Sequence, residues 1–185
     1  MCDRVPYSNY TAVGNVVRAR IGTRGFIYGN ECFRPFLDQG EVYSLGPSLP
    51  SFLDLISVDY YFRCVPGVDP LAEVRYIEAF INESMRPRLL SHQKIMVVPG
   101  LFGSANFSND GSLEVQEECV LAKLNGFHTL SMADADIVGL IPWHWLNFPP
   151  SYYKFAPHME LGAESFPKVV ARLGELQRGY KNDVV

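Results

Sequence analysis

The stretch that decides the fold runs from Ile137 to Trp145 and reads IVGLIPWHW. It is a short apolar run that begins with β-branched residues, and a helical pattern lies on each side of it. Such a run is typical of a strand buried in a parallel sheet. Its aromatic and polar side chains come where the strand should end, and in α/β barrels that end carries the active site. The stretch therefore predicts an α/β fold with a site at this strand end.

Outward from this stretch, three more short apolar runs alternate with helical patterns. We expect strands at 25–31, 52–61, 95–103 and 137–145, and helices at 10–20, 71–90, 112–125 and 165–178. Gly126 is a plausible stop for the third helix, Ser112 and Ser165 are plausible N-caps, and Pro87 is expected to bend or end the second helix. Strands that alternate with helices predict right-handed βαβ units and a parallel sheet.

The number of strands predicts part of a barrel. Four parallel strands with outer helices make about four βα units of a (β/α)8 TIM barrel, and a complete barrel needs about 250 residues. The chain has 185 residues. We therefore expect residues 1–185 to form a single partial TIM-barrel domain, the C-terminal part of the barrel, truncated on its N-terminal side. A small open doubly wound sheet is the alternative, although the chain has no Gly-rich phosphate-binding loop.

Composition narrows the classes of partner. The net charge is −4 and no basic run occurs, so no nucleic-acid partner is expected. No apolar window is long enough for a transmembrane helix, and the N-terminus lacks the features of a signal peptide, so no membrane partner is expected. The cysteines show no metal-ligand spacing, so no metal or other cofactor is expected. The spacing allows disulfides but identifies no pair among Cys2, Cys32, Cys64 and Cys119.

Four segments resemble uncharacterised barrel proteins related to glycoside hydrolases. They are GFIYGNE (25–31), LISVDYY (55–61), HQKIMVVPGLFGS (92–104) and ADIVGLIPWHW (135–145), and the resemblance spans roughly residues 25–180. In the large clan of retaining glycosidases, an Asn-Glu pair at one strand end supplies the acid/base, and a second Glu at a later strand end is the nucleophile. Asn30 and Glu31 match the first element. The later strand ends carry no carboxylate that matches the second.

Two carboxylates are the candidate catalytic groups. Glycoside hydrolysis needs such a pair, about 5–5.5 Å apart for retention and about 6.5–9.5 Å apart for inversion. Glu31 and Asp59 form the best pair, because each lies near the carboxyl end of an expected strand. Asn30 is predicted to hold a sugar hydroxyl or to orient Glu31. The alternatives are a salt-bridged or capping Glu31 and an Asp59 that serves as a structural hydrogen-bonding centre.

Aromatic side chains are the candidate sugar contacts. Trp143 and Trp145 are two positions apart, so on a strand they share a face and His144 points the other way. Trp145 is slightly favoured as the sugar platform, and simple packing is the alternative for both tryptophans. His144 is either a second acid/base, a hydrogen-bond donor to substrate, or a structural residue. Tyr61 shares the face of Asp59 and is predicted to position it or to contact substrate.

These features predict a glycoside hydrolase-like protein that acts on or binds a carbohydrate, with glycosidase activity left open. A non-catalytic carbohydrate-binding barrel or an inactive barrel fragment is the alternative. Because a half barrel exposes a sheet edge and apolar surface, an incomplete barrel is expected to self-associate. Lys94, Asp134 and Asp136 precede strands, at the end opposite the expected site, and are interpreted as structural, like His92.

Overall fold

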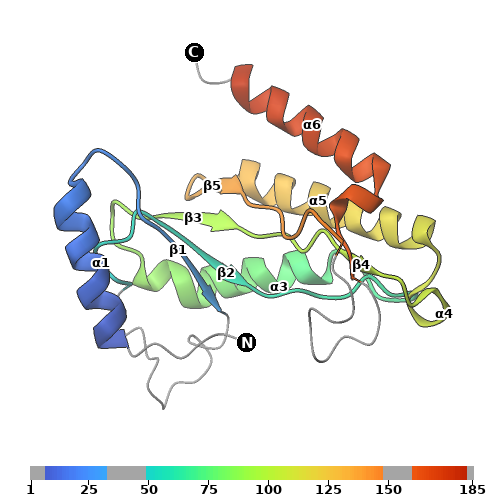
Figure 1. The fold of residues 1–185 in the computed structure, drawn as a ribbon, viewed down its shortest axis with the longest axis horizontal. Coiled ribbons are helices and arrows are strands. Elements are labelled where there is room, and N and C mark those ends of the chain that lie inside the picture. The colour runs from blue at the N-terminus through green and yellow to red at the C-terminus, as the bar shows by residue number, and fades with distance from the viewer. Residues whose placement is uncertain (1–6, 33–48, 148–159, 183–185) are drawn as a thin grey trace. The chain divides into compact units, whose positions relative to one another are not determined.

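The computed structural model describes residues 7–32, 49–147 and 160–182 (Figure 1). The elements in chain order are α1 (Tyr7–Ile21), β1 (Tyr28–Cys32), β2 (Leu55–Asp59), α3 (Ala72–Phe80), the π-helical turn η1 (Ile81–Met85), the 3-10 turn η2 (Arg86–Arg88), β3 (Lys94–Val97), β4 (Gly103–Ser104), α4 (Phe107–Asp110), α5 (Leu113–Ala133), β5 (Ile137–Leu140), β6 (Glu160–Leu161), the 3-10 turn η3 (Ala163–Ser165) and α6 (Pro167–Asn182).

The chain divides into two compact units. Unit 1 comprises residues 1–60, 76–98 and 131–140, and unit 2 comprises residues 61–75, 99–130 and 141–185. The larger sheet belongs to unit 1, and a short antiparallel pair, β4 with β6, belongs to unit 2.

Unit 1 contains a four-stranded parallel sheet in the order β1-β2-β3-β5 (Figure 1). The predicted α/β class and the predicted parallel pairing are thereby confirmed. The strands neighbour one another in the order in which they occur in the chain. Strand β5 ends at Leu140, so only the first part of the stretch at 137–145 is regular strand.

The two faces of this sheet differ in burial. Strand alternation and register assign the following buried side chains to one face: Ile56, Ile95, Val97 and Ile137. The same rules place one fully buried residue, Ser57, on the other face, together with less buried ones: Tyr28, Asn30, Leu55, Lys94 and Met96. Parallel sheets are usually covered on both faces. The described part of this sheet is covered well on one face and only partly on the other.

The second predicted helix is confirmed in its first part, and helical turns of other kinds continue it to Arg88, next to Pro87. Its apolar residues recur every three or four positions, and within unit 1 they are buried: Ile77, Phe80, Ile81 and Met85. Regular α-helix stops at Phe80, and the chain continues through η1 into η2, which contains Pro87. Pro87 lacks the N–H that a further helical turn would need, which explains why the helical turns end at Arg88, but it does not explain the end of regular α-helix at Phe80.

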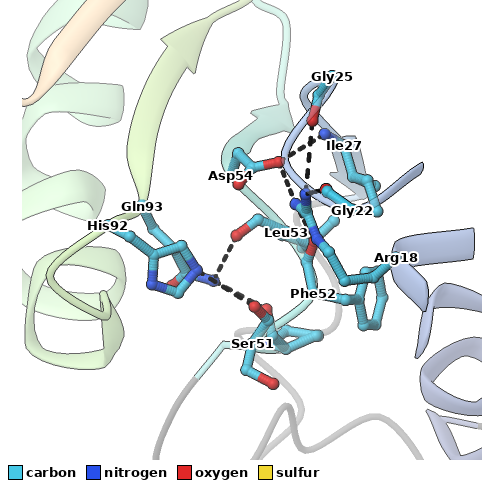
Figure 2. Close-up of polar contacts among 11 residues, drawn as sticks. Arg18, Gly22, Gly25, Ile27, Ser51, Phe52, Leu53, Asp54, His92 and Gln93 are labelled. Atoms are coloured by element: carbon cyan, nitrogen blue, oxygen red, sulfur yellow. Dashed lines mark hydrogen bonds and ion pairs between the residues drawn. The ribbon is translucent and has the colours of Figure 1, made fainter. Parts of the chain in front are cut away.

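Helix α1 is fastened to the segment before β2 by Arg18 and Asp54 (Figure 2). The Arg18 guanidinium donates to the Phe52 carbonyl at 2.8 Å and to the Asp54 carboxylate, and the Ile27 N–H donates to the same carboxylate at 2.7 Å. Burial raises the pKa of Asp54, but the hydrogen bonds from Ile27 and Arg18 outweigh burial. The pKa of this carboxyl therefore lies below its ordinary value.

Charged side chains at the amino-terminal ends of β3 and β5 form a network of ion pairs. Lys94 Nζ lies 2.6 Å from Asp136 Oδ1, and Arg86 contacts both Asp136, at 2.5 Å, and Asp134. Nearby in sequence, His92 Nε2 lies 3.2 Å from the Ser51 carbonyl oxygen (Figure 2). These contacts hold the ends of neighbouring strands.

Unit 2 corrects two predicted helix ends. Helix α5 continues to Ala133, so the predicted stop at Gly126 is wrong. A Cβ added at Gly126 would lie 2.8 Å from the Val74 side chain and 2.9 Å from that of Leu71, so this glycine permits close packing. Helix α6 begins at Pro167 and is preceded by Phe166, so Ser165 is not its cap.

A disulfide in unit 2 joins Cys64 to Cys119. Cys119 lies on α5, and Cys64 lies in the segment that follows β2 in the chain. The bond therefore fastens an irregular segment to a long helix. In the described part of the chain, no helix has both the length and the apolar character that crossing a membrane requires.

Candidate functional site

The predicted site residues fall in both units. Asn30, Glu31 and Asp59 belong to unit 1, and the aromatic residues and His144 belong to unit 2. The side chains of Glu31 and Asp59 lie outside the described part of the structure, so their roles stay predictions. Their backbone positions are described, and these are the starting point for the site in unit 1.

Strands β1 and β2 are adjacent and parallel, so their carboxyl ends meet at one edge of the sheet. Glu31 pairs with Val58, and Cys32 pairs with Asp59. By strand alternation, position 59 belongs to the same face as positions 30 and 57, and position 31 belongs to the opposite face. Position 59 is thus the carboxylate position that shares a face with Asn30.

Ser57 is the centre of a short hydrogen-bonded chain on that face. Its hydroxyl donates to Oδ1 of Asn30, and its Oγ lies 2.6 Å from the Tyr28 hydroxyl. A serine hydroxyl has one proton, so Tyr28 is the donor in the second bond. Ser57 is fully buried, whereas Asn30 is exposed. The hydrogen bonds of Tyr28 and Ser57 therefore orient the exposed side-chain amide of Asn30 near the end of β1. This orientation suits the predicted role of Asn30.

Unit 2 brings three of the predicted residues into one aromatic cluster, together with Phe102. The ring of Tyr61 meets Phe102 edge-on at 5.5 Å, and Phe102 stacks on His144 with centroids 5.3 Å apart. Trp143 meets the His144 ring edge-on at 6.1 Å. We refer to Tyr61, Phe102, Trp143 and His144 as the aromatic wall.

The two tryptophans differ from His144 in exposure. Trp143 is 43% exposed and Trp145 is 49% exposed, whereas His144 is 5% exposed. Because β5 ends at Leu140, this difference in exposure is not the alternation of a strand, and the predicted roles of the three residues stay predictions. Exposed indole faces are suitable surfaces for an apolar ring face. The peptide bond that joins Trp143 to His144 is cis.

Each ring nitrogen of His144 has an oxygen beside it, and one of the two contacts is a hydrogen bond. Its Nδ1 lies 2.7 Å from the Leu146 carbonyl, so this nitrogen carries the proton and donates it. Its Nε2 lies 3.4 Å from Oε2 of Glu160, which belongs to β6. Burial and these neighbours favour the structural alternative for His144 over direct contact with substrate. Sequence reasoning missed Glu160, because nothing near it in sequence indicates a partner for His144.

The backbone around Gly100 supports the wall. Trp143 N–H donates to the Pro99 carbonyl at 2.9 Å, and Leu101 N–H donates to the Trp143 carbonyl at 2.5 Å. A Cβ added at Gly100 would lie 2.9 Å from the Tyr61 ring. Glycine is therefore needed at position 100. The Gly-Leu-Phe-Gly run at 100–103 is the sequence feature that could have indicated Phe102 as a site residue.

No cluster of three or more His, Cys, Asp or Glu side chains suitable for a metal ion occurs among the residues that the structure describes. In comparisons with known proteins, the chain matches no family model, and no curated protein matches it significantly.

Proposed function

We propose that this is a glycoside hydrolase-like protein that binds a carbohydrate, with Glu31 and Asp59 as its two carboxylates. The observation that carries the proposal is the pairing of β1 with β2, which brings positions 31 and 59 to the same sheet edge. With strands about 4.8 Å apart and a rise of about 3.3 Å per residue, Cα atoms of such diagonal neighbours lie roughly 6 Å apart. Strand alternation assigns the two positions to opposite faces of the sheet, so the proposal requires both carboxylates to turn toward each other beyond the sheet edge, to the separation of about 5–9.5 Å that glycosidases use.

In this proposal Glu31 is the acid/base that protonates the leaving oxygen, and Asp59 stabilises or attacks the positively charged sugar. Asn30 binds a sugar hydroxyl, supported by its hydrogen bond from buried Ser57. Trp143 and Trp145 are the sugar platforms, supported by their exposure. Tyr61 is a further contact, supported by its place in the aromatic wall.

We also propose that the sheet of unit 1 is part of a (β/α)8 barrel. Three features support this: all four strands are parallel, they follow chain order, and only one face is well buried. In a barrel the second face would be the interior, and the carboxyl ends of the strands would be the site.

The test uses thermal unfolding and hydrolysis assays with a panel of glucose, xylose and N-acetylglucosamine oligosaccharides. We expect one sugar type to raise the Tm of the wild type and to be hydrolysed. Glu31→Gln and Asp59→Asn should abolish hydrolysis and retain the shift in Tm, since removal of a charge leaves the platforms intact. The matched control is Glu78→Gln, an exposed residue of α3 in unit 1, which should behave like the wild type.

A binding protein without catalysis is the second candidate, favoured by the absence of a match to the clan's nucleophile. It predicts a shift in Tm with no hydrolysis by the wild type. A wild type that neither shifts nor hydrolyses with any sugar of the panel would show that the carbohydrate proposal is wrong.

A further inference from the structure

Two fully buried charged side chains lie in unit 2. Neither is a neighbour in the sequence of a predicted site residue. Glu73, at the start of α3, and Lys123, in the middle of α5, form an ion pair of 2.7 Å. Their side chains are 0% and 2% exposed. Moving two charges out of water is energetically unfavourable, so a buried pair needs further hydrogen bonds around it.

Those hydrogen bonds go to the backbone of two separate segments. Glu73 Oε2 accepts from the Phe62 N–H at 2.7 Å, and Lys123 Nζ donates to the Phe62 carbonyl. Glu73 Oε1 accepts from the Gly100 N–H at 3.2 Å. The pair thus satisfies both backbone groups of Phe62 and the N–H of Gly100.

The Phe62 segment carries Tyr61, and the Gly100 segment pairs with the segment that carries Trp143. Phe62 directly follows Tyr61, so fixing its N–H and carbonyl fixes the peptide from which the Tyr61 side chain extends. Gly100 forms a parallel bridge with Trp143, whose N–H and carbonyl bond to the neighbours of Gly100. One ion pair therefore supports both ends of the wall, although Tyr61 and Trp143 lie far apart in the sequence.

We propose that Glu73 and Lys123 are the positioning residues of the aromatic wall, holding Tyr61 through Phe62 and Trp143 through Gly100. A buried ion pair adds little net stability compared with apolar residues of similar volume. Its particular contribution here is directional, since an apolar pair can fill the space but cannot accept from Phe62 and Gly100. The inference rests on the proposed function only for the kind of ligand that the wall contacts.

The test replaces both charges at once with apolar side chains, Glu73→Leu/Lys123→Met, because removing one partner alone would leave an unpaired buried charge. The matched control is Glu118→Leu/Lys168→Met, which removes an exposed ion pair of the same unit. The chain has two tryptophans, Trp143 and Trp145, so tryptophan fluorescence reports on this segment alone.

We expect the Glu73/Lys123 double variant to melt cooperatively but to show a changed emission maximum and increased acrylamide quenching, because Trp143 loses its fixed backbone. Any Tm shift that an oligosaccharide gives the wild type should be reduced or lost. The control pair should match the wild type in all three measurements. Unchanged emission and quenching in a folded double variant would overturn the inference.

The fluorescence outcome does not depend on a ligand, so failure of the carbohydrate proposal and failure of this inference are separable. If the double variant fails to fold, hydrogen exchange of the wild type decides the question. Positioning requires the amides of Phe62 and Gly100 to exchange as slowly as those in the middle of α5. Fast exchange of either amide in the native protein would contradict it.

Discussion

At the scale of single residues, buried and partly buried polar side chains fix segments that have no regular structure of their own. Asp54 accepts from the backbone of Ile27 and from Arg18, and Gln93 donates to the Leu53 carbonyl (Figure 2). Gln93 also donates to the carbonyl of Pro50. Each of these side chains replaces hydrogen bonds that a helix or sheet would otherwise supply. Removing either side chain is therefore expected to lower the free energy of unfolding more than removing a surface charge does.

Asp54→Asn should lower the free energy of unfolding at pH 7 by about 1.5–3 kcal/mol, the usual range for hydrogen bonds to a charged group. The folded-state pKa of Asp54 is lowered, so its contribution is present above the unfolded pKa of about 3.9 and is lost as the pH falls through the folded value. The difference between variant and wild type should therefore shrink in acid, which urea unfolding at several pH values measures.

Asp69→Asn is the matched control for this prediction. Asp69 forms an ion pair with Arg75, and both side chains are more than half exposed. Exposed pairs contribute little because water screens them. Asp54→Asn should lower the free energy of unfolding more than Asp69→Asn does, and its effect should depend on pH. An effect no larger than that of Asp69→Asn, or an effect of the same size at every pH, would contradict the role given to Asp54.

At the scale of elements, close backbone approach decides how helices pack. Gly14 lies in the middle of α1, and a Cβ built there would fall 2.3 Å from the ring of Phe52. The ring also meets Tyr10 edge-on at 5.3 Å. Helix α1 thus packs on Phe52 at a distance that only glycine permits.

Gly14→Ala should lower the free energy of unfolding by about 1–3 kcal/mol, as other overpacking substitutions do, although alanine favours a helix over glycine by about 1 kcal/mol. Gly174→Ala in α6 is the control, because the nearest atom to its added Cβ is 3.5 Å away. That change should stabilise the protein slightly. Denaturant unfolding of both variants checks the prediction, and the same sign for both would contradict it.

The elements were more predictable than their contacts. Apolar periodicity is a local property, so it located the starts of α1, α3 and α6 and of the four parallel strands within a few residues, whereas β3, β5 and α3 end earlier than predicted. It failed at Gly126, where packing against Val74 outweighs the usual preference of glycine for helix ends. The partners of Tyr61 and His144 depend on residues distant in sequence, such as Phe102 and Glu160, which no local pattern identifies.

At the scale of the whole molecule, a crosslink and open sheet edges determine behaviour in solution. Reduction of the Cys64–Cys119 disulfide should lower the free energy of unfolding by about 4 kcal/mol, because the bond closes a loop with a sequence separation of 55 and limits the unfolded chain. Guanidinium unfolding with and without reductant measures this. Cys64→Ser/Cys119→Ser should match the reduced protein, and equal stability of all forms would contradict the prediction.

We also expect the chain to self-associate through the sheet of unit 1. Among the described residues, β1 and β5 each pair with a single neighbouring strand, and open edges readily accept another strand. Light scattering after size exclusion should give a mass above that of one chain. Val138→Lys, an exposed residue of β5, should reduce association, whereas Val115→Lys, equally exposed on α5, should not. A monomer at all concentrations would contradict this expectation.

The disulfide in unit 2 also bears on where and how this chain can be made. Thiols in the reducing cytosol rarely stay joined, whereas secretory and periplasmic compartments oxidise them. The Cys64–Cys119 disulfide is therefore expected to form in an oxidising compartment. In a bacterial cytosol we expect both cysteines to stay reduced. Production in an oxidising host is the sensible first choice, and mass spectrometry of alkylated peptides would show which state a preparation contains.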